Sequence, residues 1–130
     1  MCIRDSSLRH VVLKTRLIDL AGKTDLLTAY ACLKRASLFI GNDSGLMHLA
    51  AAAGTPTLGL FGPSDERLYG PWGEQARVVR GSRDFETIQA ADPGFTQALC
   101  HMMDLTVPTV VEAAREMLAT SRPAVEPADA

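Results

Sequence analysis

The stretch of residues 38–54 constrains the fold of this chain more than any other part of the sequence. It begins with a short apolar run at 38–40, turns through polar residues at 42–45, and continues as an alanine-rich segment to Ala53. A continuous apolar run of this length is typical of a strand that helices cover on both faces. Gly54 stands where the C-terminal cap of a helix is expected. These residues therefore predict a buried strand at 37–40, a tight turn, and a buried helix at 44–53.

Similar patterns extend the prediction to the rest of the chain. Short strands are expected at 11–13, 17–20, 57–61 and 76–80, and further helices at 25–35, capped by Thr24, and at 108–119. Strands that alternate with helices at this spacing indicate a Rossmann-like α/β fold, a parallel sheet flanked by helices. We expect one domain at 17–119, preceded by an atypical start at 1–16 that looks like a truncation edge, and followed by a disordered tail at 120–130.

Composition and charge argue against several classes of protein. The formal net charge is −2, and Arg77, Arg80 and Arg83 are followed at once by acidic residues, so we expect a solvated face there and no nucleic-acid binding. No apolar run reaches the ~18 residues that a transmembrane segment needs. Three widely spaced cysteines indicate a reduced, cytoplasmic setting. Cys100 and His101 alone are too few ligands for zinc, so no metal site is expected.

The turn at 42–45 carries the chemistry, because ligands of open α/β sheets bind at the carboxyl ends of the strands. The first N–H groups of the following helix have no partner within the helix and attract anions. Gly45 lets a phosphate approach the backbone, and the Ser44 hydroxyl can donate a hydrogen bond to it. A helical side chain leans toward the N-terminus, which should bring the His48 ring over this turn. The combination predicts a site for a phosphorylated ligand, such as a nucleotide-sugar.

Several residues around this turn allow more than one interpretation. Asp43 would repel a diphosphate, so it either caps the helix or accepts hydrogen bonds from sugar hydroxyls. The structural alternative makes Asp43 an ordinary cap and His48 a core histidine. Lys23 could face the same edge as a charge for a phosphate, or be a plain solvent lysine. Ser64 and Asp65 follow the strand at 57–61 and could form another wall, or simply the polar tip of a rigid Gly-Pro turn.

The segments 42–56 and 60–65, with their runs NDSGLMHLAAAAGTP and LFGPSD, closely resemble family-nine glycosyltransferases, the ADP-heptose:lipopolysaccharide heptosyltransferases. The upstream run LAGKTDL at 20–26 and the run CHMMDLTV at 100–107 match this family too. The resemblance extends over about residues 18–119 and favours the second heptosyltransferase of the inner core over the first.

This resemblance implies a GT-B architecture of two facing Rossmann-like domains, of which this chain looks like the C-terminal, donor-binding one. It implies that Ser44, Gly45 and His48 contact the donor diphosphate and that Asp43 contacts the sugar. Lys23 and Thr24 would lie near the nucleotide. The remaining expected loop contacts are Asn42, Ser64 and Asp65.

The implied reaction transfers heptose from ADP-heptose to the lipopolysaccharide inner core without a metal or other cofactor. The general base of such enzymes belongs to the N-terminal domain, so we assign no catalytic residue here and expect weak donor binding and no transfer by this chain alone. The acceptor implies a cytoplasmic protein with peripheral contact at the inner membrane. The alternatives are another GT-B enzyme that uses a UDP-sugar, a non-catalytic nucleotide-binding module, or a structural domain with an empty site.

Overall fold

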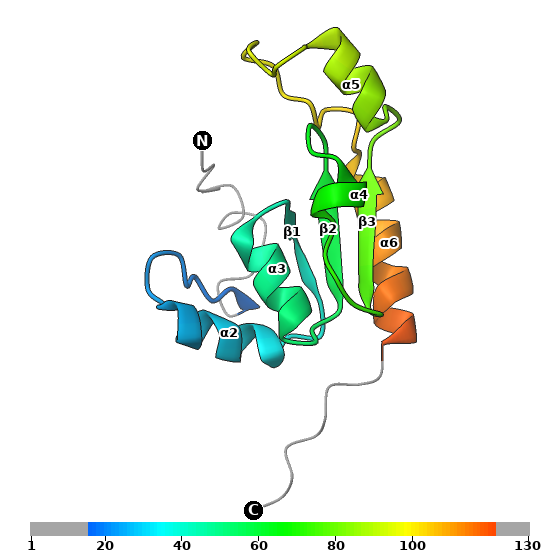
Figure 1. Cartoon of the computed structure of the whole chain (residues 1–130). Coiled ribbons are helices and arrows are strands. Elements are labelled where there is room, and N and C mark those ends of the chain that lie inside the picture. The colour runs from blue at the N-terminus through cyan, green and yellow to red at the C-terminus, as the bar shows by residue number, and fades with distance from the viewer. Residues whose placement is uncertain (1–15, 122–130) are drawn as a thin grey trace, which may run out of the picture.

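Three parallel strands form the sheet at the centre of the part of the chain that the structure describes. The computed structural model describes residues 16–121. The expected atypical start up to residue 15, with the strand expected at 11–13, and residues 122–130 of the expected tail lie outside the described residues. The strands β1 (Phe39–Asn42), β2 (Thr57–Phe61) and β3 (Ala76–Arg80) pair in the order β1-β2-β3. Helices α2 (Leu26–Lys34) and α3 (Gly45–Ala52) precede and follow β1. The expected Rossmann-like α/β fold is confirmed (Figure 1).

Helices lie on both faces of the sheet, and β2 is buried as its apolar residues predict. The expectation of a buried strand is wrong for β1, where Ile40 is 45% exposed. Leu58 and Val79 form a core with Ala113 and Met117 of α6 (Val107–Thr120). Side chains alternate along a strand, so the neighbours of Leu58 face the opposite side of β2. There the sulfur of Met47 in α3 would lie only 2.8 Å from a Cβ added to Gly59. The absence of a side chain at Gly59 therefore lets α3 approach the sheet closely.

The helix after β1 begins and ends close to the predicted residues. Ser44 is its N-cap, and Gly54 beyond its end has a φ of +76°, which glycine adopts without strain. The expectation that α3 is buried all round is wrong, because only Met47 and Ala50 are buried and Leu46 is 52% exposed. The helix contacts the sheet along one face, and its other face is accessible.

The predictions for residues 17–25 are partly wrong. Residues 17–20 form no strand, and Ile18 is 81% exposed. A turn begins at Leu20, whose carbonyl oxygen accepts a hydrogen bond from the Lys23 N–H at 3.1 Å. Asp25, not Thr24, caps α2, since its carboxylate accepts from the Thr28 N–H at 2.7 Å. The helix therefore begins one residue later than expected, and a carboxylate in place of a hydroxyl satisfies a free N–H group of its first turn.

Two short helices follow the carboxyl ends of β2 and β3. The short helix α4 (Glu66–Tyr69) follows β2, and α5 (Phe85–Ala91) follows β3 in a segment where the sequence pattern was unclear. Figure 1 shows α5 and the loop after it beyond the carboxyl ends of β2 and β3. Helix α6 then returns along the sheet, with Pro108 in its first turn as predicted. In the described part of the chain, no helix has the length and apolar character needed to cross a membrane.

Candidate functional site

The pairing of the strands brings three turns together at one edge of the sheet. Asn42, the last residue of β1, lies opposite Leu60, and Phe61 at the end of β2 lies opposite Arg80 at the end of β3. The strands therefore end nearly level. The turn at 43–44, the loop at 62–65 and the turn at 81–84 follow these ends directly, so they are neighbours at the edge where α/β proteins bind ligands.

The turn after β1 presents the amino end of α3. Ser44 has an extended backbone, with φ −161° and ψ 163°, and its Oγ accepts from the Met47 N–H at 3.4 Å. This contact leaves the hydroxyl hydrogen of Ser44 available for donation. The N–H groups of Gly45 and Leu46 precede the first hydrogen bond of the helix. A Cβ added to Gly45 would have no heavy atom within 4 Å, so the space in front of the turn is open.

His48 leans back over this turn, as its place in the helix predicts. Its Nε2 lies 3.8 Å from Oδ1 of Asp43, and the two side chains are 48% and 27% exposed. His48 is therefore not a core histidine, and the structural alternative for this residue is wrong. The capping role considered for Asp43 is also wrong, because Ser44 caps the helix. An exposed imidazole and a carboxylate thus flank the open helix end.

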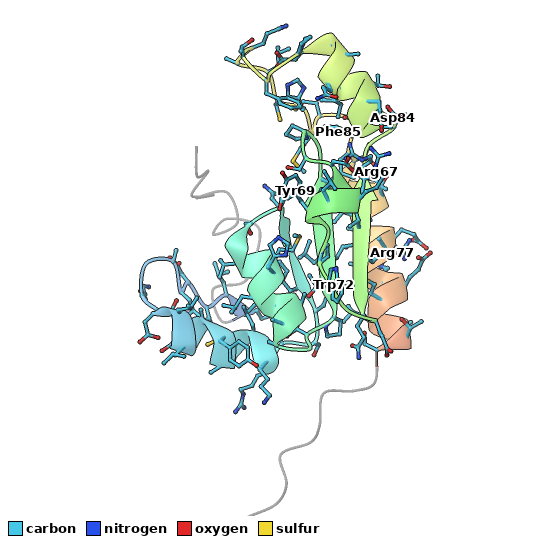
Figure 2. All side chains as sticks on the ribbon, viewed as in Figure 1. Arg67, Tyr69, Trp72, Arg77, Asp84 and Phe85 are labelled. Atoms are coloured by element: carbon cyan, nitrogen blue, oxygen red, sulfur yellow. The ribbon has the colours of Figure 1, made fainter. Side chains whose placement is uncertain are left out.

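Of the two ligand contacts predicted in the loop after β2, Ser64 and Asp65, Asp65 is bonded within the protein. Asp65 caps α4, and its carboxylate accepts from the backbone and side chain of Arg67, with Arg67 Nε at 2.9 Å from Oδ1. Hydrogen bonds from Arg67 hold the pKa of Asp65 below its usual value. Arg67 also pairs with Glu86 of α5 at 2.5 Å, near the sheet edge in Figure 2. Ser64 is half-buried beside this network and its hydroxyl is the remaining candidate contact of the loop.

The other predicted contacts lie at different distances from the turn. Asn42 ends β1 and is exposed directly beside it. Lys23 donates from Nζ to the backbone oxygen of Asp19 at 2.9 Å, within its own turn before α2. Figure 1 places that turn on the far side of α3 from β2. The structure thus brings Asn42, Asp43, Ser44 and His48 together, and contact of Lys23 and Thr24 with a nucleotide stays a prediction.

The expectation of a solvated face is wrong for Arg80, which instead forms hydrogen bonds with the loop 62–65. Its side chain is only 11% exposed and donates to the backbone oxygens of Gly62 and Ser64 at 2.8 and 2.7 Å. Its position at the end of β3, opposite the end of β2, brings it to these carbonyl groups. In the sequence, the only signal was an arginine at a strand end near a Gly-Pro loop, which by itself is weak.

A buried pair holds the loop after α5. Asp92 is fully buried; one carboxylate oxygen accepts from the N–H groups of Thr96 and Gln97, and the other lies 3.0 Å from Nε2 of His101. His101 thus has a structural partner. The described residues contain no group of three or more His, Cys, Asp or Glu side chains placed to hold a metal. Sequence spacing missed this pair because its members lie nine positions apart on an irregular loop.

A second carboxylate joins the segment after α5 to the end of β3. Asp104 accepts from the Arg83 backbone N–H at 3.0 Å and from its guanidinium at 2.9 Å. A Cβ on Gly81 would lie 2.4 Å from the Asp104 carboxyl group, so only glycine permits this approach. The hydrogen bonds from Arg83 hold the pKa of Asp104 well below its usual range.

The lowered pKa of Asp104 predicts a pH-dependent contribution to stability. The unfolded chain binds more protons than the folded one near the ordinary carboxyl pKa of about 3.9, so the free energy of unfolding falls with falling pH. The Asp104→Asn variant should be less stable than the parent chain at pH 7, and the difference should shrink as pH falls below about 4 through the lowered pKa. Urea unfolding at pH 7 and pH 3 measures it, with Glu112→Gln on α6 as the control. A difference for Asp104→Asn that is equal at both pH values would contradict this origin.

The geometry defines a Rossmann-like α/β domain with an open helix terminus at the carboxyl edge of its sheet. Residues 5–92 match glycosyltransferase family 9 (heptosyltransferase), and the chain belongs to this family. This match includes the whole turn at 42–48.

Several curated relatives are similar to this chain over part or most of its length. The lipopolysaccharide heptosyltransferase 2 of Salmonella typhimurium is 34% identical over 102 residues, which are 77% of this chain and 28% of that protein. The lipooligosaccharide heptosyltransferase 2 of Haemophilus influenzae is 32% identical over 105 residues, 78% of this chain and 30% of the relative. The lipopolysaccharide heptosyltransferase 3 of Escherichia coli is 47% identical over 58 residues, 45% of this chain and 17% of the relative. The chain thus spans less than a third of these relatives, and no solved structure matches it significantly.

Proposed function

We propose that this chain binds the diphosphate of a nucleotide-sugar at the turn 43–48, as the donor-binding half of a GT-B glycosyltransferase. The observation that carries the proposal is the open amino end of α3, with Ser44 and Gly45 in front and His48 beside it. Family membership narrows the ligand class to glycosyl donors. For the whole protein we propose transfer of heptose from ADP-heptose to the lipopolysaccharide inner core, by analogy with the names of its relatives.

The chemistry of this role follows from the charge that develops on the leaving ADP. The N–H groups of Gly45 and Leu46 and the helix dipole stabilise negative charge at the amino end of α3. The Ser44 hydroxyl and a ring N–H of His48 add donors that strengthen as the sugar–phosphate bond breaks. Asp43 would accept hydrogen bonds from sugar hydroxyls. These donors can stabilise the negative charge of the diphosphate without a metal ion, so we propose metal-independent transfer.

The acceptor and its setting belong to the same proposal. A lipid-linked inner core would place the reaction at the cytoplasmic face of the inner membrane, with peripheral contact only. Cys32 and Cys100 are free and exposed, which suits a reducing compartment. The relatives of this chain are named for lipopolysaccharide or lipooligosaccharide, and that similarity supports the acceptor class.

Calorimetric titration of the chain with ADP and with UDP tests the proposed donor. We expect ADP to bind more tightly than UDP, and His48→Ala to weaken ADP binding about tenfold, the effect of losing one charge-assisted hydrogen bond. Arg115→Ala is the matched control, because it removes a cation from the exposed face of α6 without touching the site. Tighter binding of UDP would point to the rival UDP-sugar enzyme, and no binding of either nucleotide would contradict the proposal.

A further inference from the structure

The loop that follows β2 depends on a side chain from the next strand. Residues 62–65 connect the end of β2 to α4, and the carbonyl oxygens of Gly62 and Ser64 accept hydrogen bonds from Arg80. Arg80 lies opposite Phe61 in the sheet, so its side chain reaches across the end of β2. The same loop borders the turn 43–48, because β1 and β2 end side by side.

Every nitrogen of the Arg80 guanidinium group has a partner in this arrangement. Nη1 donates to Gly62 O at 2.8 Å, Nη2 to Ser64 O at 2.7 Å, and Nε to the Glu66 carboxylate at 3.1 Å. Nη2 also pairs with Glu66, whose pKa this arginine lowers. Glu66 begins α4, so one side chain connects the loop at two carbonyl groups and at the helix that follows it.

Arg77 provides the contrast on the same strand. Its side chain is 46% exposed and pairs with Glu116 of α6 at 2.5 Å. In Figure 2, Arg77 lies beside α6, away from the loop 62–65. Exposed pairs of this kind contribute little to stability because solvent screens them. The Arg80 side chain is 11% exposed and donates to two backbone oxygens of the loop 62–65, whereas Arg77 forms no hydrogen bond with this loop.

We propose that Arg80 is a positioning residue of the ligand site: it holds residues 62–65 in place so that the Ser64 hydroxyl faces a ligand bound at the turn 43–48. This inference rests on the proposed function. The planar guanidinium group can reach two carbonyl oxygens and a carboxylate at once, whereas the single ammonium group of lysine cannot. Arg80 itself touches no ligand, because its donors are all used by Glu66 and by the backbone oxygens of Gly62, Ser64 and Arg83.

The test uses Arg80→Lys, which keeps the charge, with Arg77→Lys as the matched control on the same strand. Hydrogen exchange of the amides at 62–67 and ADP affinity by calorimetry are measured in both variants and in the parent chain. We expect Arg80→Lys to accelerate exchange in this loop and to weaken ADP binding about tenfold, and Arg77→Lys to change neither. Glu66→Gln, which leaves the two carbonyl contacts intact, is the second variant if Arg80→Lys fails to fold, with an expected loss of about threefold.

The outcomes separate this inference from the proposed function. Unchanged ADP affinity in Arg80→Lys or, should that variant not fold, in Glu66→Gln would overturn the positioning role while ADP binding by the parent chain upholds the function. An equal loss of affinity in Arg77→Lys would also overturn it, because the effect would then be one of general stability. A parent chain that binds no ADP would overturn both.

Discussion

Replacement of Gly45 by valine is expected to leave the chain folded and to reduce its affinity for ADP about a hundredfold, or about 2.7 kcal/mol. The reason is the open space in front of this residue: a Cβ there meets no heavy atom of the protein within 4 Å. The side chain would instead occupy the place where a phosphate must approach the N–H groups of α3. Two lost charge-assisted hydrogen bonds account for a loss of this size.

Thermal unfolding and calorimetry on the same sample separate the two effects. A surface substitution at the start of a helix changes the free energy of unfolding by about 0.5 kcal/mol or less, so the unfolding temperature should be nearly constant. Gly45→Ala is the graded control, with a smaller side chain and a smaller loss of affinity. Ser44→Ala is less informative, because Ser44 caps α3 and its removal costs about 1 kcal/mol of stability. If Gly45→Val bound ADP as tightly as the parent chain, the diphosphate would not lie at this turn.

Replacement of Asp92 by alanine is expected to reduce the free energy of unfolding by about 3 kcal/mol, which is typical for the loss of one member of a buried polar pair. Asp92 is fully buried and accepts from two backbone N–H groups as well as contacting His101. Its removal leaves the buried His101 ring and two part-buried N–H groups without their acceptor, and each unsatisfied group has a cost of its own.

Urea unfolding at neutral pH measures the effect of Asp92→Ala. The control is Asp84→Ala, which removes the exposed cap of α5 and should lower the free energy of unfolding by clearly less than Asp92→Ala. Asp92→Asn keeps one acceptor oxygen and should fall between the two. Equal losses for Asp84→Ala and Asp92→Ala would show that the buried pair adds nothing beyond an ordinary cap.

The elements that sequence reasoning located best are those with local signals. The strands at 57–61 and 76–80 were predicted with their observed bounds, because the first is an apolar run after Pro56 and the second carries the β-branched pair Val78 and Val79 after the Gly-Pro loop. The start of α3 was likewise clear from Ser44 and the alanine-rich segment after it. Residues 17–20 had the same apolar character, yet form no strand in the described structure, since an apolar run does not specify a pairing partner.

The parts of the site that could not be predicted depend on partners distant in the sequence. The position of His48 over its turn follows from helix geometry, and it was anticipated. The contacts of Arg80 with Gly62 and Ser64 join two strands, and those of Asp92 with His101 close an irregular loop. Such pairs have no fixed spacing, so Arg80 was wrongly assigned to a solvated face. Whether Asp43 or Ser44 caps α3 depends on whether the helix begins at residue 44 or 45, and the sequence does not define a helix start to within one residue.

Binding of a nucleotide diphosphate at the turn 43–48 can be located by titrating ADP into the isotope-labelled chain and following the backbone amide signals by NMR. This measurement detects weak binding and locates it. We expect the largest shifts at Gly45, Leu46 and Met47, with smaller ones in the loop 62–65. Shifts that are absent, or that centre on another part of the molecule, would contradict binding at this turn.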